Sequence, residues 1–319
     1  ICLIGPILML VSVIIPTKNE EKNIGNCLAS LEKQTFKDFE VLICDGGSID
    51  GTENIVVETG HAPSLRGKIN FHSLRSDLGY QRRFGAEKAR GKYLCFIDAD
   101  MVLDPEVLES CVALFEVSVT PAEAGVHDGL EMHHDGMNSR LRGNDWKVGA
   151  IVIPEVSFGM GFWAKVKAFE KQMYIGDDRV EAARFFLKEA YEKSGGWRKG
   201  MVAGEDWDLS RRVKEAGYSI ARVNELIHHN EGKISLTRTL RRKFYYAQKA
   251  TPYLQENVKG LKDYLLFIFR PAYFRHWHEF LKHPIIGAAF CFMKSFEIGA
   301  GFLGVFSKRF VKTDYEKTK

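Results

Sequence analysis

Residues 93–100 read YLCFIDAD, an apolar run of strand-forming residues that stops at two carboxylates one residue apart. In an extended chain, residues two apart point to the same side, so Asp98 and Asp100 are expected to face one site just past a buried strand. Open α/β sheets bind ligands at that end of their strands. Two oxygen ligands suit Mg²⁺ or Mn²⁺ and, through the metal, a diphosphate. The alternative is a capped turn with both acids in solvent.

Strands and helices alternate on both sides of this stretch. Short β-branched runs predict strands, and apolar residues at helical spacing predict the helices between them. The other expected strands cover residues 11–16, 39–44, 69–74, 148–154, 183–187 and 219–223. The main expected helices cover 26–33, 105–116, 162–174 and 205–215, and residues 76–90 are expected to form a loop and a helix. This order predicts an α/β, Rossmann-like fold with a mainly parallel sheet flanked by helices.

The composition is that of a globular chain, with 319 residues, 45% of them hydrophobic and 27% charged. The net charge is +4, and much of the basic excess lies in the C-terminal quarter, which could meet nucleic acid or an anionic membrane surface. The six cysteines include no CxxC pair and no ligand-like cluster. They therefore indicate reduced thiols and a cytoplasmic location.

Three regions are expected along the chain. An apolar segment over residues 1–10, which lacks the features of a signal peptide, precedes a catalytic domain over 11–232, and a helical, basic and apolar region over 233–319 follows. Within the domain, residues 118–146 are rich in Gly, His, Asp and Asn and have no period. They outnumber the residues of ordinary loops, so we expect a surface insertion with solvated histidines and not a metal cluster.

Five short motifs occur in a defined order. They are PTKNE at 16–20, DGGSIDGT at 45–52, DAD at 98–100, GGW at 195–197 and EDWDL at 205–209. Together they resemble family 2 glycosyltransferases of the GT-A fold, over residues 11 to about 255. The resemblance implies transfer of a sugar from a nucleotide sugar to an acceptor, with inversion and with Mg²⁺ or Mn²⁺. A metal suits this reaction because charge builds up on the departing diphosphate.

The resemblance also implies metal ligands. Asp100 is the expected direct ligand, and a late histidine is the second, for which His229 fits better than His228. Asp98 is expected to reach the ribose or a metal-bound water, and Ala99 lies beside the donor. The alternative for the histidines is that one packs in the core and the other is solvated.

The nucleotide sugar, UDP- or GDP-linked, is expected over the ends of the first strands. Pro16, Thr17 and Glu20 in the first loop, with Asp45 and Gly47 after the second strand, match the family's nucleoside positions. A carboxylate there can accept a hydrogen bond from a base or a ribose hydroxyl. Asp45 could also close a turn with the glycines.

Three further residues, Asp77, Gln81 and Arg82, match the segment that faces the pyrophosphate in the family. An acid near phosphate is unfavourable. Asp77 is therefore expected either to bind a hydroxyl or to cap the helix.

An inverting transfer needs a base that removes the proton of the acceptor hydroxyl. The resemblance assigns this role to Asp206, while Glu205 orients either Asp206 or the acceptor. The alternative is that these acids only stabilise the start of a helix.

Residues 284–306 are strongly apolar and nearly long enough to span a bilayer, but Lys294 and Glu297 fall inside them. These charges favour an interfacial helix or a hairpin over a simple transmembrane span. A core helix packed on the catalytic domain is the alternative. A membrane contact would favour a polyprenyl-phosphate or lipid-linked glycan acceptor.

The sequence therefore predicts a metal-dependent, inverting glycosyltransferase, peripheral to the cytoplasmic face of a membrane. Its acceptor is a glycan or a lipid phosphate, and nucleic acid is not expected as a partner. One alternative is a nucleotidyltransferase, in which Glu205 and Asp206 have no natural role. The other is an inactive module that binds a nucleotide sugar or a glycan.

Overall fold

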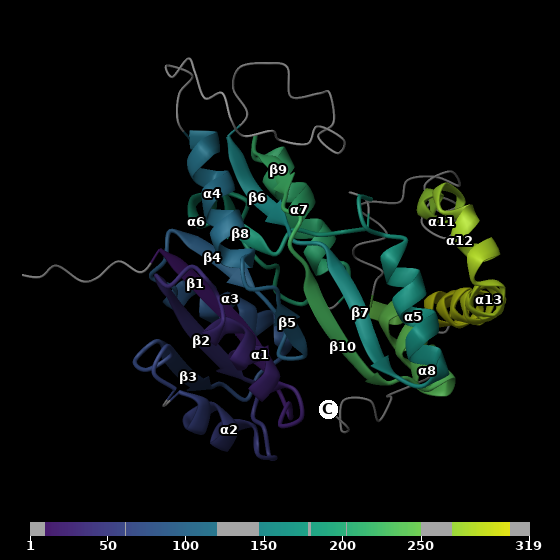
Figure 1. Cartoon of the computed structure of the whole chain (residues 1–319), viewed down its shortest axis with the longest axis horizontal. Coiled ribbons are helices and arrows are strands. Elements are labelled where there is room, and N and C mark those ends of the chain that lie inside the picture. The colour runs from purple at the N-terminus through teal and green to yellow at the C-terminus, as the bar shows by residue number, and fades with distance from the viewer. Residues whose placement is uncertain are drawn as a thin grey trace, which may run out of the picture.

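A seven-stranded sheet with strand order β3-β2-β1-β4-β8-β6-β9 forms the centre of the protein (Figure 1). The computed structural model describes residues 10–60, 62–119, 147–177, 180–201, 203–249 and 270–306. The strands are β1 (Val11–Thr17), β2 (Phe39–Asp45), β3 (Ile69–Ser73), β4 (Tyr93–Phe96), β6 (Val148–Val152), β8 (Phe185–Leu187) and β9 (Ser219–Arg222). The first four are parallel, β8 is antiparallel to both neighbours, and β6 and β9 are parallel. The mainly parallel α/β sheet predicted from the sequence is confirmed.

The central strands are apolar runs because helices cover both faces of the sheet. Every residue of β1, β2 and β4 is buried, as expected for doubly covered parallel strands. The helices of this domain are α1 (Ile24–Glu32), α2 (Thr52–Thr59), α3 (Leu78–Lys88), α4 (Val107–Val119), α6 (Lys188–Lys193) and α7 (Glu205–Glu215). Gly85 of α3 permits close contact with β1, since a Cβ there would lie 2.4 Å from the Ile14 side chain.

A second, three-stranded sheet has the order β5-β10-β7 and brings distant parts of the chain together. Its strands are β5 (Met101–Leu103), β7 (Glu155–Met160) and β10 (Ile227–Lys233), with β10 antiparallel to β5 and parallel to β7. Sequence patterning did not predict them, because β5 has only three residues, only one residue of β7 is buried, and β10 is mostly polar and half-buried. Helix α4 also begins at Val107 and not at residue 105 as expected.

The C-terminal helices form a separate layer on one side of the molecule (Figure 1). They are α8 (Leu236–Lys249), α11 (Pro271–Arg275), α12 (Trp277–Lys282) and α13 (Pro284–Phe306), and they pack with α5 (Phe162–Gln172). A small hydrophobic core joins α5 to α13 through Val166, Phe169, Met173, Phe290 and Met293. Because α13 is one continuous helix, the hairpin alternative for residues 284–306 is wrong.

Parts of the expected domain scheme lie outside the described residues. These parts are residues 1–9 of the apolar segment and residues 120–146 of the expected insertion. The domain boundaries therefore stay predictions. Of the described cysteines, Cys27, Cys44, Cys95 and Cys111 are buried thiols and Cys291 is exposed.

Candidate active site

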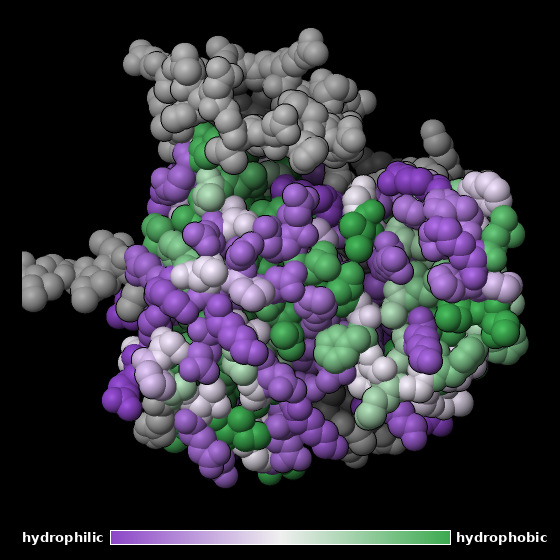
Figure 2. All heavy atoms as spheres, in the orientation of Figure 1, coloured by the Kyte–Doolittle hydropathy of each residue, from purple (hydrophilic) through white to green (hydrophobic). Residues whose placement is uncertain are grey.

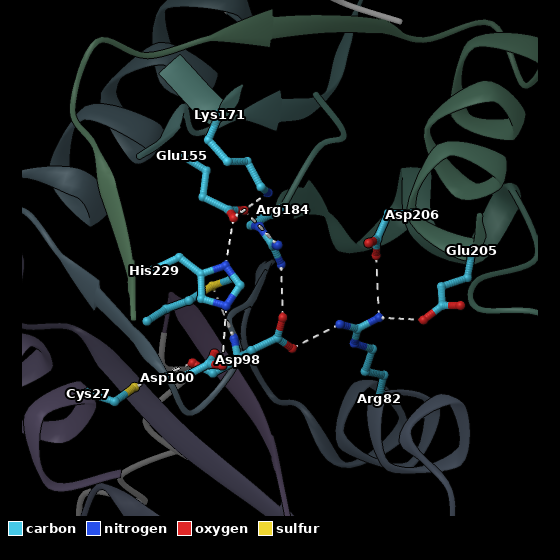
Figure 3. Close-up of polar contacts among 11 residues, drawn as sticks. Cys27, Arg82, Asp98, Asp100, Glu155, Lys171, Arg184, Glu205, Asp206 and His229 are labelled. Carbon is cyan, nitrogen blue, oxygen red and sulfur yellow. Dashed lines mark hydrogen bonds and ion pairs between the residues drawn. The ribbon is translucent and has the colours of Figure 1, made fainter. Parts of the chain in front are cut away.

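The two acids of residues 98–100 lie in a turn at the end of β4, where they border one site (Figure 3). The strand ends at Phe96, and the Met101 N–H donates to the Asp98 carbonyl at 3.1 Å. The expected geometry, two side chains on one side of an extended strand, is therefore wrong. The turn instead directs Asp98 toward α3 and Asp100 toward β10, as their partners show.

Two guanidinium groups hold Asp98. Its Oδ1 lies 2.9 Å from Arg82 Nη2, and its Oδ2 lies 3.7 Å from Arg184 Nη1. Burial opposes ionisation of Asp98, but the charges of Arg82 and Arg184 outweigh it and lower its pKa to about 2. Asp98 is therefore a permanent carboxylate at neutral pH.

Arg82 joins the end of β4 to the start of α7. Its side chain is only 4% exposed, and Nη1 lies 3.1 Å from Glu205 Oε1 and 3.3 Å from Asp206 Oδ1. Gly204, in the left-handed conformation at φ 79°, precedes the acid pair and directs it into the site. The guanidinium also lies over the Trp197 ring at 4.8 Å. One cation thus holds three carboxylates together.

The acid pair is electrostatically asymmetric. Burial and the negative charge of Asp206 raise the pKa of Glu205 to about 8, although Arg82 acts in the opposite direction. Glu205 Oε2 is buried and has no hydrogen-bond partner in the described structure. At neutral pH Glu205 is therefore mainly protonated. This favours Asp206 as the carboxylate that can accept a proton.

The second sheet brings His229 to Asp100. The distance from His229 Nε2 to Asp100 Oδ2 is 3.2 Å, and Nδ1 lies 2.8 Å from Glu155 Oε1. Neighbouring residues of a strand point to opposite faces, so His228 turns away and contacts Asp104 Oδ1 at 2.9 Å. Of the two histidines, only His229 lies beside Asp100.

The environment of His229 favours a proton on both nitrogens. Burial opposes protonation, but the hydrogen bonds to Asp100 and Glu155 outweigh it and raise the pKa of His229 to about 10. Glu155 itself is held by Lys171 Nζ at 2.8 Å and Arg184 Nη2 at 3.0 Å. Burial opposes its ionisation, yet the Lys171 charge and the His229 hydrogen bond keep its pKa well below the usual range.

These residues fit a divalent cation. Asp100 Oδ1 is buried and has no hydrogen-bond partner in the described structure. Buried polar atoms normally have a partner, and a bound cation would provide one. A carboxylate and an imidazole are suitable ligands for Mn²⁺ or Mg²⁺. No group of three or more His, Cys, Asp or Glu among the described residues has the geometry of a complete metal site. A cation here would therefore share its coordination with substrate phosphates and water, as Mg²⁺ commonly does.

The loop after β2 folds around Asp45. Its Oδ2 accepts from the N–H groups of Gly47 (2.9 Å) and Ser48 (2.8 Å), and its Oδ1 accepts from the hydroxyls of Ser48 (2.5 Å) and Thr17 (3.1 Å). A carboxylate has about four acceptor positions, and all are used. Asp45 therefore closes the turn, and a nucleoside would have to displace one of these donors to bond with it. Gly47 has φ 87°, a conformation that favours glycine.

Asp77 and Gln81, which are expected from the sequence to face a pyrophosphate, make contacts within the local structure. Asp77 caps α3 by accepting from the Tyr80 N–H at 2.8 Å, which is the capping alternative. Gln81 is buried and its Nε2 donates to the Ser76 carbonyl at 2.9 Å. A Cβ on Gly46 would lie 2.3 Å from that Nε2, so Gln81 packs directly on the Asp45 turn.

The remaining predicted donor residues border the same strand ends. Pro16 in β1 and Ala99 in the turn are buried. Glu20 lies in the first loop, where its Oε2 accepts from Asn23 Nδ2 at 2.8 Å. Contact with a nucleotide sugar stays a prediction for all three.

A cavity of about 160 Å³ opens beside the acid pair. Its walls include Glu155, Lys171, Tyr174, Arg184, Asp206 and Trp207. It mixes aromatic surface with hydrogen-bonding groups and has Asp206 at its wall. It is therefore the candidate position for an acceptor.

Sequence reasoning missed Glu155, Lys171 and Arg184. Glu155 and Lys171 gave no signal, because β7 was not expected and Lys171 looks like a surface lysine of a helix. Arg184 did give one, since it is a single cation within the apolar residues 183–187. A charge inside a buried strand must find a partner, and Arg184 finds Asp98 and Glu155.

The seven-stranded, mainly parallel sheet with its flanking helices has the GT-A fold. Residues 12–136 match the model of "Glycosyl transferase family 2", so this part of the chain is a family 2 glycosyltransferase domain. The chain is also similar to the mannosyltransferase PcManGT from Pyrobaculum calidifontis, solved in complex with GDP-Man and Mn²⁺. The TM-score is 0.61 over 94% of this chain and 88% of that chain. At 16% identity, this likeness shows the fold.

Curated relatives match over parts of their length. Glycosyltransferase AglE from Haloferax volcanii is 35% identical over 219 residues, which cover 68% of this chain and 65% of AglE. Validoxylamine A glucosyltransferase from Streptomyces hygroscopicus subsp. limoneus is 34% identical over 135 residues, which cover 40% of this chain and 28% of that protein. The chain thus spans less than two thirds of either relative.

Proposed function

We propose that this protein transfers a glycosyl residue from a UDP- or GDP-linked sugar to an acceptor, with inversion and with the help of Mg²⁺ or Mn²⁺. One observation carries the proposal. Arg82 holds the acid pair of α7 against Asp98, directly beside the Asp100–His229 pair. The proposed proton acceptor, Asp206, is thus connected through Arg82 and Asp98 to the turn that carries Asp100 of the proposed cation-binding pair. GDP-Man and Mn²⁺ in the fold neighbour make that donor and that metal reasonable first choices.

Asp206 is the base of the proposed reaction. It takes the proton of an acceptor hydroxyl, and the acceptor oxygen forms a bond to the anomeric carbon of the donor sugar. The bond from that carbon to the diphosphate breaks on the opposite face, and its electron pair leaves with the nucleoside diphosphate. Glu205, mainly protonated, orients Asp206 or the acceptor. Arg82 is a positioning residue, because it holds both acids without reaching the cavity.

Asp100 and His229 would hold the cation, which supplies charge neutralisation for the departing diphosphate. To hold the cation through Nε2, His229 would have to lose the proton that Nε2 shares with Asp100, while its Nδ1–H would still donate to Glu155. Asp98, held by two arginines, is left for a ribose hydroxyl or a metal-bound water.

The acceptor is proposed to enter the cavity beside Asp206. A glycan hydroxyl would need the base, whereas a polyprenyl phosphate already carries a charged oxygen. We propose that the protein works in the cytoplasm, at the membrane face, where both acceptor types are supplied for envelope glycans. The buried, unpaired cysteines agree with a reducing compartment.

Two other functions are weaker. A nucleotidyltransferase has no natural role for an acid pair on the acceptor side. An inactive binding module would retain donor and metal binding but would not hydrolyse the donor. Slow, metal-dependent release of nucleoside diphosphate from one nucleotide sugar, chosen by a thermal-shift screen, distinguishes the enzyme from the module.

Asp206→Asn tests the proposed base. We expect transfer to fall by about 10²–10⁴-fold, with nucleotide affinity within about twofold of wild type. Glu215→Gln is the matched control, an exposed acid at the far end of the same helix. Equal losses of transfer and nucleotide binding in Asp206→Asn would contradict the assignment.

A further inference from the structure

The charges inside α13 point into the protein. Lys294 Nζ lies 2.5 Å from Glu170 of α5 and 2.6 Å from Glu297, and Glu297 lies 3.8 Å from Lys243 of α8. Glu170 and Glu297 are buried. The two charges that interrupt the apolar sequence of α13 are therefore neutralised on its inner face.

Close packing fixes the orientation of α13. A Cβ on Gly304 would lie 2.4 Å from the carbonyl oxygen of Phe244, so the helix backbone approaches α8 directly. Phe290 and Met293 fill the inner face against α5. The helix cannot rotate about its axis without breaking both contacts and the ion pairs.

The opposite face of α13 is apolar and exposed. Ile285 is 75% exposed, Phe292 and Phe296 are each 49% exposed, and Leu303 is 62% exposed. Their spacing of seven, four and seven residues places all four on one stripe of a helix. Trp277 and Leu281 of α12 extend this surface at 61% and 69% exposure. We call these six residues the outer face.

Hydrophobic residues gather at the right-hand edge of the molecule, over α12 and α13 (Figure 2). Cations accompany them on the exposed surface. Arg275 and Lys282 are exposed, and each follows an exposed apolar residue, Phe274 or Leu281. An apolar surface with adjacent cations matches the boundary between acyl chains and anionic headgroups.

The 21 residues Pro284–Gly304 of α13 are long enough and apolar enough to cross a bilayer, judged by length and composition alone. Its neighbour α8 argues against crossing. Arg241 of α8 is exposed and lies within one turn of Lys243, which contacts Glu297 near the middle of α13. A crossing α13 would carry this arginine toward the hydrocarbon centre, where a charge is costly.

We infer that the outer face docks on a bilayer that contains anionic lipids, with α12 and α13 lying in the plane of the interface. The bilayer is thus a partner of the proposed transferase. The docking itself does not depend on the proposed function, and only its purpose rests on that proposal. The C-terminal helices contact the wall of the cavity beside Asp206. The Tyr273 hydroxyl of α11 lies 2.6 Å from the hydroxyl of Tyr174, which lines this cavity. An acceptor carried by a lipid would reach the cavity from this side.

Vesicle sedimentation of the full chain, without donor or acceptor, tests the docking. We expect binding to phosphatidylcholine vesicles with about a third phosphatidylglycerol, at least tenfold weaker binding to phosphatidylcholine alone, and release by alkaline carbonate. Phe292→Glu/Phe296→Glu should lower the partition coefficient at least tenfold. Val57→Glu/Val117→Glu is the matched control, because it places the same two charges at positions of α2 and α4 that are 54% and 71% exposed.

Three results would overturn the inference. They are wild-type protein that stays in solution, equal loss of binding in the control variant, and bound protein that resists carbonate, which indicates a spanning helix. Circular dichroism of each variant checks that it is folded. Since no step requires catalysis, a failure here leaves the proposed transferase intact, and a failed transfer assay leaves the docking intact.

Discussion

Glu155→Gln is the sharpest test of the metal site, because Glu155 contacts the histidine but not the space for the cation. Its Oε1 lies 2.8 Å from His229 Nδ1 and 2.8 Å from Lys171 Nζ, and its Oε2 lies 3.0 Å from Arg184 Nη2. Such a carboxylate fixes the orientation of the imidazole and makes its other nitrogen a better ligand. Glutamine keeps the size of the side chain and removes the charge.

The expected loss can be bounded. Replacing the outer partner of a ligating histidine typically costs about 10–100-fold in metal affinity, or about 1.4–2.7 kcal/mol. The upper half of the range is expected here. The amide nitrogen of glutamine must face at least one of Lys171, Arg184 and His229, all of which donate to Glu155 now.

Titration of Mn²⁺ in the presence of UDP or GDP, followed by electron paramagnetic resonance of free Mn²⁺, measures this affinity directly. Ser157→Ala is the matched control, since Ser157 lies on the same strand and contacts Glu231 at 3.1 Å. Mn²⁺ affinity of Glu155→Gln within twofold of wild type, with the control unchanged, would refute the reasoning.

Further predictions concern the neighbouring residues. His229→Ala should weaken Mn²⁺ binding more than Glu155→Gln does, whereas His228→Ala should leave it within twofold, as the same titration will show. The free energy of unfolding of Glu205→Gln, compared with that of the wild type, should be more favourable at pH 9 than at pH 5 by up to about 4 kcal/mol. Each unit of pKa shift is worth about 1.4 kcal/mol. The pKa of the wild-type Glu205 carboxyl is raised from 4.5 to about 8 in the folded protein, so the unfolded chain releases this proton first and the wild type loses stability as the pH rises from about 4.5 to about 8. Urea unfolding of both proteins at the two pH values checks this, and a difference independent of pH would contradict it. Arg82→Met should lower the free energy of unfolding by about 3–5 kcal/mol at pH 7.5, because it removes the buried cation that the Asp98 and Asp206 carboxylates share with the mainly protonated Glu205. A loss below about 1 kcal/mol in urea unfolding would show that Arg82 does not hold them.

Local sequence patterns, mainly runs of apolar residues, predicted most strands of the seven-stranded sheet. The apolar runs of β1, β2 and β4 are buried on both faces, so their composition alone identifies them. The strands of the second sheet lack such a signal. Their pairing partners come from residues more than 60 positions away, and neither β7 nor β10 is a run of buried apolar residues.

The chemistry divides in the same way. The sequence by itself determined the family, the two acids after β4 and the acid pair at the start of α7, because each is a local motif with its own residue types. The family resemblance favoured His229 over His228, and the tertiary structure adds the physical reason, since the register of β10 against β5 turns His229 toward Asp100 and His228 away. Only the tertiary structure revealed that Arg82 contacts the side chains of three acidic residues and that Glu155 contacts His229. Such contacts depend on where distant elements meet, and a residue's identity does not reveal its partner across the fold.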